Sequence, residues 1–199
     1  MNTKAQDFFG NDDYFIDEKV AFLKFTNTYK VYKSNGEQIG AVKEKMPAGL
    51  KILSLFLNKA FFPFKLNIVN TEDEILATIK RGWTFVISKI EILDSDGNTI
   101  AHIRQKFKVL KPTFNILDAQ QNLIAEIKGD WKAWNFSITD EKENQLGTIT
   151  KKWAGILKEV FTTADKYIVS VKPGLAIDAR KISIVAMAIA IDMVLKESK

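Results

Sequence analysis

The alternation of hydrophobic and polar residues gives way, near the C-terminus, to an almost purely apolar run. Residues 182–195 (ISIVAMAIAIDMVL) contain only two polar side chains, Ser183 and Asp192. A membrane-spanning helix needs about 20 apolar residues, so this run is too short to span comfortably. A surface helix carries a polar stripe, whereas an all-round apolar pattern is typical of a helix enclosed by protein. We therefore predict a central helix over residues 178–195, with Asp178 as its N-cap.

Upstream of this run, a short hydrophobic pattern repeats along the chain. The unit is an apolar residue, a small residue, any residue, and then Ile or Val. Its five copies are residues 39–42, 76–79, 100–103, 124–127 and 146–149. Each copy follows a cluster of turn-forming residues, and an apolar strand precedes each cluster. This order predicts a β-hairpin that is used five times.

The hairpins, together with N-terminal strands predicted at residues 14–16, 21–25 and 29–32, give roughly ten to twelve strands, enough to close a barrel. The small residue of each motif faces the same side as the Ile or Val two positions later, where it would let a central helix approach. The predicted fold class is mainly β: a closed antiparallel β-barrel of about twelve strands around a buried hydrophobic C-terminal helix. We expect one domain over residues 1–199.

Two segments fall outside the hairpin pattern. Residues 1–13 are polar, and we expect a loose N-terminal arm. Residues 46–62 (MPAGLKILSLFLNKAFF) form an insertion in which Leu50, Leu53 and Leu57 recur at helical spacing. We interpret the insertion as a helix packed over one end of the barrel. The alternative is an interfacial membrane helix or a protein-docking patch.

The composition is that of a folded domain with a weakly basic balance. Hydrophobic residues make up 46% of the chain and charged residues 27%, which excludes a disordered chain. The net charge of +5 favours anionic partners, although 24 acidic residues are interspersed with 29 basic ones. The absence of cysteine excludes disulfides and thiolate chemistry and is consistent with a cytoplasmic location. No signal peptide is visible in the sequence.

Basic residues stand directly after four of the five motif copies. Each of them points away from the Ile or Val before it, and therefore outward. Successive copies would place them in a belt around the barrel wall, while the acidic turns gather at one rim. The alternative is that these are ordinary solubilising side chains. The candidate lipid- or anion-binding residues are Lys43, Lys80, Arg104, Lys106, Lys108 and Lys128.

The tryptophans lie near predicted strand ends. They are Trp83, Trp131, Trp134 and Trp153. Such positions suit core or corner aromatic residues, and the alternative is that they anchor the protein in a membrane interface.

Residues that could carry catalysis are few. His102 is the only histidine, and it alternates with Arg104 and Lys106 on the polar side of a strand, so we expect it to face solvent. The sequence has no nucleophile elbow, phosphate-binding loop, dinucleotide-binding glycine pattern or histidine-rich metal spacing. We expect no catalytic residues, no cofactor and no enzymatic activity. An enzyme would need groups that only the fold brings together, such as a pocket at a barrel mouth.

The C-terminal quarter resembles the signature of the phospholipid scramblase family and, less specifically, of the LURP-one-related proteins. The segment KKWAGILKEVFTTADKY is followed by a helix that contains Ile-Asp. The resemblance implies the Tubby-like fold, a twelve-stranded barrel around a hydrophobic C-terminal helix. The matching residues are Trp153, Gly155, Ile156, Leu157, Lys158, Glu159, Phe161, Thr162, Ala164, Asp165, Tyr167, Ile191 and Asp192.

The chain departs from the family at its calcium segment. The family has an acidic residue directly after Phe-Thr, where this chain has Thr163. Asp165 remains, but residues 172–174 (KPG) lack the later acidic position. Because hard cations need several oxygen ligands, we expect no metal site. The chain also lacks the palmitoylated cysteines and the proline-rich N-terminal region of animal members, and it resembles a compact bacterial-type member.

The resemblance and the basic belt together suggest a non-enzymatic, lipid-associated protein. It would bind anionic phospholipid or phosphoinositide-like headgroups as a peripheral membrane protein and could assist lipid movement. A helix enclosed by strands cannot cross a bilayer at the same time. The alternative is a soluble adaptor with a protein partner or, less favoured, a nucleic-acid partner.

Overall fold

A computed structural model describes residues 3–19, 28–45, 62–83, 89–106, 113–130, 132–151 and 166–197, with the side chains of residues 18–19 and 192–197 not described. The predicted strands at residues 21–25, the helix within 46–61, and Lys108 fall outside these residues. So do Trp131, Trp153 and the signature residues between 153 and 165.

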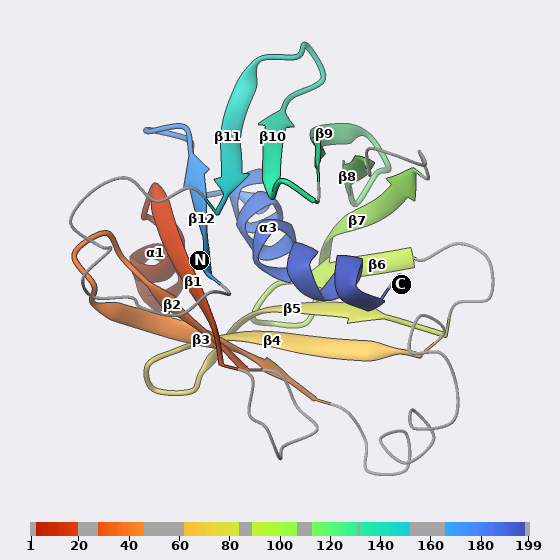
Figure 1. The fold of residues 1–199 in the computed structure, drawn as a ribbon. Helices are drawn as coiled ribbons and strands as arrows, with labels where there is room; N and C mark the ends of the chain where they lie inside the picture. Colours follow the sequence, from red (N-terminus) through yellow and green to blue (C-terminus); the bar gives the residue numbers. More distant parts are fainter. Residues whose placement is uncertain are drawn as a thin grey trace.

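Twelve antiparallel strands form a closed barrel in the described chain (Figure 1). Each strand pairs with its neighbours in sequence, and β1 closes the wall by pairing with β12. The predicted fold class is confirmed. The strands are β1 (Asp13–Lys19), β2 (Thr28–Tyr32), β3 (Gln38–Glu44), β4 (Phe64–Asn70), β5 (Ile75–Arg81), β6 (Lys89–Leu93), β7 (Thr99–Lys106), β8 (Thr113–Asp118), β9 (Leu123–Asp130), β10 (Asn135–Thr139), β11 (Gln145–Thr150) and β12 (Lys166–Val171).

The five predicted hairpins are all present, and their turns share one geometry. Four of the turns begin with Asn or Asp, whose side-chain oxygen accepts backbone N–H groups; Asp140, for example, accepts from Lys142 at 2.9 Å and Asn144 at 2.8 Å. The fourth residue of every turn has a positive φ, which lets the chain reverse within five residues. These residues are Gly36, Asp73, Gly97, Gln121 and Glu143.

The repeated motif encodes a β-bulge that directly follows each turn. In each hairpin the register shifts by one residue, so that one residue of the motif strand has no partner across the pair. In β7, Thr99 pairs with Leu93 and Ala101 with Ile92, which leaves Ile100 as the extra residue. The extra residues are Ile39, Leu76, Ile100, Ile124 and Leu146, the first residue of every copy.

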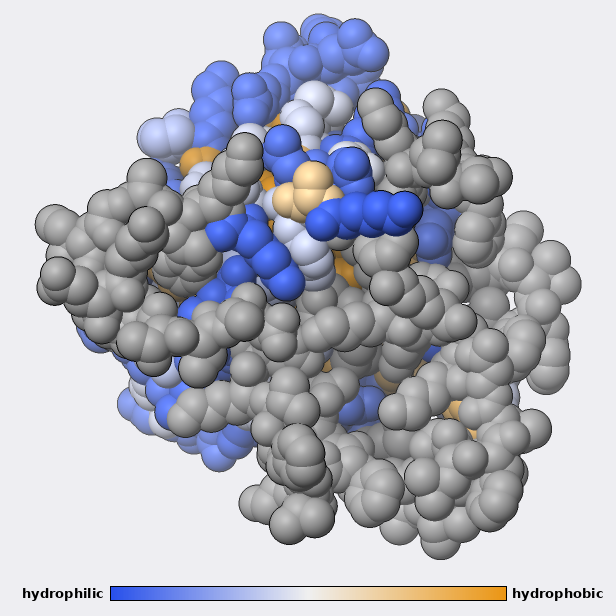
Figure 2. All heavy atoms as spheres, viewed as in Figure 1, coloured by the Kyte–Doolittle hydropathy of each residue, from blue (hydrophilic) through white to orange (hydrophobic). Residues whose placement is uncertain are grey.

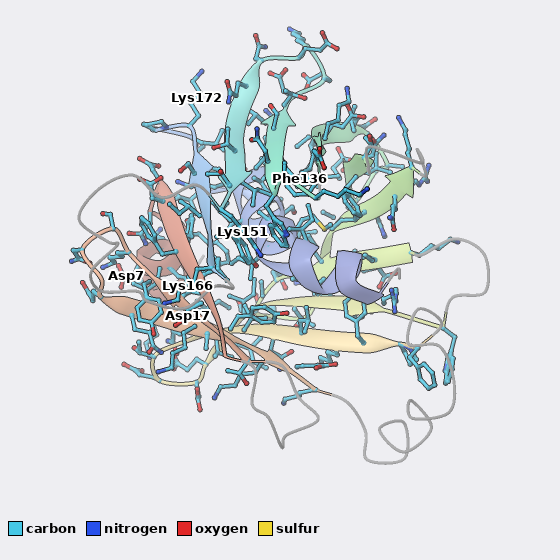
Figure 3. All side chains as sticks on the ribbon, in the orientation of Figure 1. Asp7, Asp17, Phe136, Lys151, Lys166 and Lys172 are labelled. Carbon is cyan, nitrogen blue, oxygen red and sulfur yellow. The ribbon has the colours of Figure 1, made fainter. Side chains whose placement is uncertain are left out.

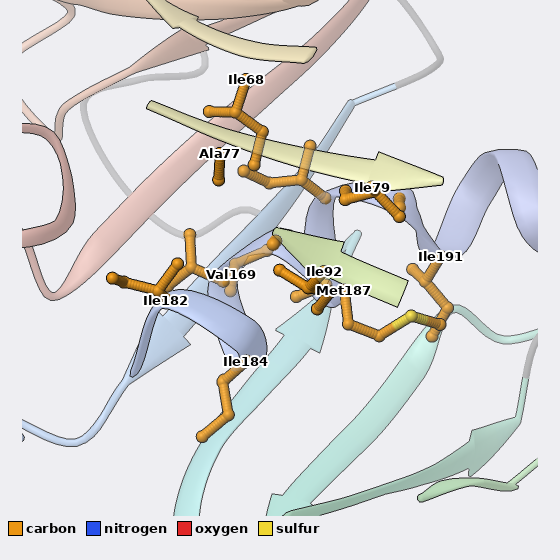
Figure 4. Close-up of a cluster of buried hydrophobic side chains, with 14 of the residues drawn as sticks. Ile68, Ala77, Ile79, Ile92, Val169, Ile182, Ile184, Met187 and Ile191 are labelled. Atoms are coloured by element: carbon orange, nitrogen blue, oxygen red, sulfur yellow. The ribbon is translucent and has the colours of Figure 1, made fainter. Parts of the chain in front are cut away.

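Helix α3 (Ala179–Glu197) lies inside the barrel, surrounded by the strands (Figure 1). Residues 183–191 are at most 1% exposed, and the interior cluster includes Met187 and Ile191 packed near Ile79 and Ile92 (Figure 4). The Tyr167 hydroxyl donates a hydrogen bond to the carbonyl oxygen of Ile189 at 2.5 Å, which ties β12 to the helix. The enclosed helix explains why the sequence lacks a polar stripe here.

The expected loose arm at residues 1–13 is wrong. Thr3–Phe9 forms helix α1, whose Ala5, Phe8 and Phe9 are buried in the same core as α3. The side-chain amide of Asn11 donates to the carbonyl oxygens of Asp7 and Phe8, both at 2.9 Å, and so caps the helix. A seven-residue helix with two adjacent phenylalanines has too little periodicity to be recognised, and its stability comes from burial.

The alternating strand directions give the barrel two different ends. The five hairpin turns lie at one end, which we call the turn end. The connections from β1 to β2, β3 to β4, β5 to β6, β7 to β8, β9 to β10 and β11 to β12 leave from the other end, which we call the loop end. Helix α3 starts at the turn end, after β12, and runs toward the loop end.

Candidate functional site

The described residues of the predicted basic belt lie on the outer face of the wall, because their strand neighbours point into the core. The side chains of Lys43, Lys80, Lys106 and Lys128 are between 42% and 57% exposed, and Arg104 is also exposed. The predicted direction of these side chains is therefore correct. Their role in binding remains a prediction.

Most of the belt is paired with acidic side chains. Lys43 Nζ lies 2.6 Å from Asp73 Oδ1, and Lys80 Nζ lies 2.9 Å from Glu91 Oε2. Lys128 pairs with Glu126, and the hydrogen bond from this carboxylate raises the pKa of Lys128. Exposed ion pairs contribute about 0–1 kcal/mol each. They are therefore weak enough to be exchanged for contacts with an external anion.

Arg104 departs from this pairing pattern. Its Nη2 donates a hydrogen bond to Gln121 Oε1 at 2.6 Å, so among the described residues its charge faces an amide and not a carboxylate. Lys89 lies directly opposite Arg104 across the β6–β7 pair, and both are exposed. Positive charge therefore accumulates locally on this part of the wall.

A second feature is the separation of charge between the two ends. The sequence predicted the acidic rim, whereas it predicted the cations as a belt and not at the opposite end. The five hairpin turns (33–37, 70–74, 94–98, 118–122 and 140–144) carry ten carboxylates and two lysines, a net charge of −8. In the view of Figure 2, hydrophilic side chains are dense around the β10–β11 turn at the top. Hydrogen bonds from Asn122 and Asn144 lower the pKa values of Asp118 and Asp140, so these carboxylates stay ionised.

The loop end has the opposite charge. We count the last two residues of each odd-numbered strand, the first two of each even-numbered strand, and the described residues of the connections between them. These positions hold eleven cations and three carboxylates, a net charge of +8. The cations are Lys19, Lys43, Lys45, Lys65, Lys80, Arg81, Lys89, Lys106, Lys132, Lys151 and Lys166.

Lysines meet directly across the strands at this end. Lys65 on β4 lies opposite Lys80 on β5, and both are exposed. The backbone N–H of Lys45 donates to the carbonyl oxygen of Lys65 at 2.7 Å, which places these residues side by side. Like charges directly opposite one another destabilise a sheet. The ion pair with Glu91 offsets the charge of Lys80.

Two aromatic residues at the loop end differ in exposure. Trp134 is partly buried, packs against Phe136 and Tyr167, and has Lys151 Nζ 4.3 Å above its ring. This placement supports the corner-aromatic interpretation for Trp134. Trp83 follows β5 and is 51% exposed.

Two buried lysines form ion pairs with aspartates in β1 or directly before it. Lys166 Nζ lies 3.8 Å from Asp17 Oδ2 (Figure 3), and Lys181 Nζ lies 3.3 Å from Asp12 Oδ1. The Lys181 pair joins the start of α3 to the segment after α1. Sequence reasoning missed both pairs, because their members are distant in the chain and follow no motif.

A shallow cleft of about 300 Å³ lies at the turn end, lined by α1 and by the β2–β3 and β4–β5 turns. Its floor includes Phe8 and Ile39. Lys4 spans it to Glu72 at 2.6 Å and Glu74 at 2.8 Å, and these carboxylates raise the pKa of Lys4. The hydrogen bond from Lys4 lowers the pKa of Glu74. The charged side chains at this cleft therefore form ion pairs with one another, and the lining residues do not form a nucleophile–base pair.

Candidates for catalysis or metal binding do not converge in the described part of the chain. His102 lies on the outer face of β7, partly exposed and opposite Glu91. Within the described ranges, no three His, Cys, Asp or Glu side chains gather as metal ligands. Asp165 lies outside those ranges. The barrel interior, where a pocket would support an enzyme, is filled by α3.

A comparison of the sequence with protein-family models decides the family. The model described as Scramblase matches residues 20–198, which is nearly the whole chain. The chain belongs to the scramblase family. The family match covers all ten hairpin strands, β2 to β11, and so extends well beyond the C-terminal segment that carries the motif resemblance.

The fold of this scramblase-family chain is similar to that of a plant protein. The X-ray structure of the Arabidopsis thaliana protein AT5G01750 superposes with a TM-score of 0.52 and 9% sequence identity. The match covers 94% of this chain and 91% of the plant chain. At this identity the similarity establishes the Tubby-like fold alone. No curated protein matches the sequence.

For a scramblase-family member, the position of the apolar C-terminal helix is informative. Within the described residues, none of the helices combines the length and the hydropathy needed to cross a membrane. The apolar side chains of α3 between residues 184 and 191 are buried against the surrounding strands. The signature residue Asp192 lies in α3.

Proposed function

We propose that this protein binds anionic phospholipid at a membrane surface without catalysing a reaction, and that the basic loop end of the barrel makes the contact. Membership of the scramblase family and the barrel fold support a scramblase-like or lipid-binding role. The observation that carries the more specific proposal is the separation of charge, with a net −8 in the hairpin turns and +8 at the loop end.

This separation gives the protein a preferred direction of approach. An anionic membrane attracts the loop end and repels the turn end, so the barrel stands on the membrane with its hairpin turns pointing away. Each lysine near the surface contributes about 1 kcal/mol of binding free energy. Any assistance of lipid movement would start from this bound state, with α3 still enclosed. Arg104 and Lys128 on the wall extend the basic surface.

A vesicle-binding assay tests this proposal. We expect the protein to co-sediment with vesicles that contain phosphatidylserine, to ignore vesicles of pure phosphatidylcholine, and to dissociate at high salt. Replacing Lys65, Lys80 and Lys106 with Gln should weaken binding on the order of 100-fold, from about 1 kcal/mol per lysine. Replacing Lys33, Lys142 and Lys172 with Gln removes the same charge from the turn end and should leave binding unchanged.

Two outcomes would count against the proposal. Equal loss of binding in both triple variants would show that only net charge matters. Binding to duplex DNA at physiological salt, with none to phosphatidylserine vesicles, would instead favour the alternative of a nucleic-acid adaptor.

A further inference from the structure

Trp83 stands apart from the other large apolar side chains in the described chain. Its side chain is 51% exposed, and Ile75, 38% exposed, is the other large hydrophobic residue with an exposed surface there. Both belong to one strand and its continuation, with Ile75 at the turn end and Trp83 at the loop end. A single exposed apolar residue is ordinary on a protein surface. Trp83 differs because it packs against a buried ring and lies near several lysines.

The indole rests on a rigid base. Its ring lies 5.3 Å from the ring of Phe62, which is 2% exposed. The carbonyl oxygen of Phe62 accepts hydrogen bonds from Arg81 Nη2 at 2.8 Å and Nε at 3.3 Å. Arg81 is itself 6% exposed, and its guanidinium lies 4.6 Å from the centre of the Phe64 ring. Trp83 therefore packs on one side against a well-held Phe62, which reduces the orientational freedom that the indole loses on binding.

Lysines flank this tryptophan in the chain and across the sheet. Lys80 precedes it by three residues, Lys65 lies opposite Lys80, and Lys45 lies beside Lys65. Tryptophan has an apolar body with one N–H donor and favours the headgroup region of a bilayer, where both parts are satisfied. Lysines in the same region attract anionic headgroups. A soluble phosphate would use the lysines alone.

We propose that Trp83 inserts into the headgroup region of an anionic bilayer and fixes the docking orientation, with the loop end down. This inference rests on the proposed function and deepens it, because it identifies the partner as a lipid surface and not a free phosphate. The insertion is shallow: the indole enters the interface, and the barrel wall and α3 stay intact.

Partition into phosphatidylserine-containing vesicles tests the role of Trp83. Trp83→Ala should weaken partition tenfold or more, whereas Ile75→Ala, which removes the other exposed apolar side chain at the turn end, should change it less than twofold. Thermal unfolding should show both variants folded. In inositol phosphate binding, with no bilayer present, Trp83→Ala should match the wild type.

A label placed beside Trp83 reads out insertion without altering the tryptophan. The chain has no cysteine, so Gly82→Cys and Ser95→Cys each accept one environment-sensitive fluorophore, and Gly82 is an exposed neighbour of Trp83 with nothing within 4 Å of a Cβ atom. On vesicle addition the emission at position 82 should shift to shorter wavelength and be quenched by lipids spin-labelled near the headgroup. The label at position 95, in the β6–β7 turn, should not respond.

The results separate this inference from the proposed function. If the wild type binds the vesicles but Trp83→Ala binds equally well and position 82 gives no shift, the anchor is overturned and the basic-surface proposal stands. If the wild type fails to bind the vesicles, both are overturned.

Discussion

Gly40 shows how a single position of the repeated motif is constrained. A Cβ atom there would lie 2.2 Å from the backbone oxygen of Val69 and 2.9 Å from the Phe8 ring of α1. The sequence predicted a small residue facing inward, and Gly40 is buried as expected. The reason differs from the one predicted, because the neighbours that exclude a side chain are β4 and α1 and not the central helix. Pleat periodicity identifies a face but not the atoms across it.

We predict that Gly40→Ala destabilises the protein by about 1–3 kcal/mol, because a backbone atom cannot move away as the tip of a side chain can. The melting temperature should fall by roughly 2–12 °C for a domain of this size. Gly82→Ala is the matched control, since nothing lies within 4 Å of a Cβ atom there. Equal melting temperatures for the two variants would contradict the close approach.

At the scale of elements, the hairpin turns were predictable and α1 was not. The turn clusters and the motif that follows them recur five times, so each copy supports the others. Helix α1 occurs once, is seven residues long, and is held by Phe8 and Phe9 in a core built from distant strands. The Lys166–Asp17 pair could not be predicted for the same reason, because its members come from the first and last strands. Local pattern carries no information on such contacts.

The turn carboxylates predict how stability depends on pH. The pKa values of Asp118 and Asp140 are lowered in the folded protein, chiefly by side-chain hydrogen bonds from Asn122 and Asn144. A carboxylate with a lowered folded pKa stabilises the protein above its unfolded pKa of about 3.9 and loses that contribution as the pH falls through the folded value. The melting temperature should therefore decline below about pH 4.

Replacing both aspartates with Asn should make this acid decline shallower. Asn retains the oxygen that accepts the backbone N–H groups, as Asn70 does in the β4–β5 turn, but it does not titrate. Thermal melts between neutral and acidic pH, run on wild type and double variant together, measure the difference. An identical acid decline in the two proteins would show that these turns do not contribute to it.

At the scale of the whole molecule, the barrel has two effects: it buries α3, and it separates acidic from basic residues. It buries an apolar helix that would otherwise need a membrane or a partner. Its strand directions also sort the charged residues, with carboxylates in the tight turns and lysines where the longer connections begin. The sequence predicted the barrel and the acidic rim. It predicted the cations only as a belt that follows four of the five motif copies. Lys45, Lys65 and Lys89 follow no motif copy, and only the strand pairing shows that they lie at the same end of the barrel.

The central claim is that α3 remains enclosed by the strand wall while the outer surface meets the membrane. Cysteine accessibility tests it directly, because the native chain has none. In the Met187→Cys variant the new thiol replaces a side chain that is 0% exposed, and in Ser95→Cys it lies in an exposed turn. A thiol reagent should modify position 95 rapidly and position 187 barely at all, both in buffer and with bound phosphatidylserine vesicles. Rapid modification at position 187, or its appearance only when vesicles are added, would contradict the account by showing that the helix leaves the barrel.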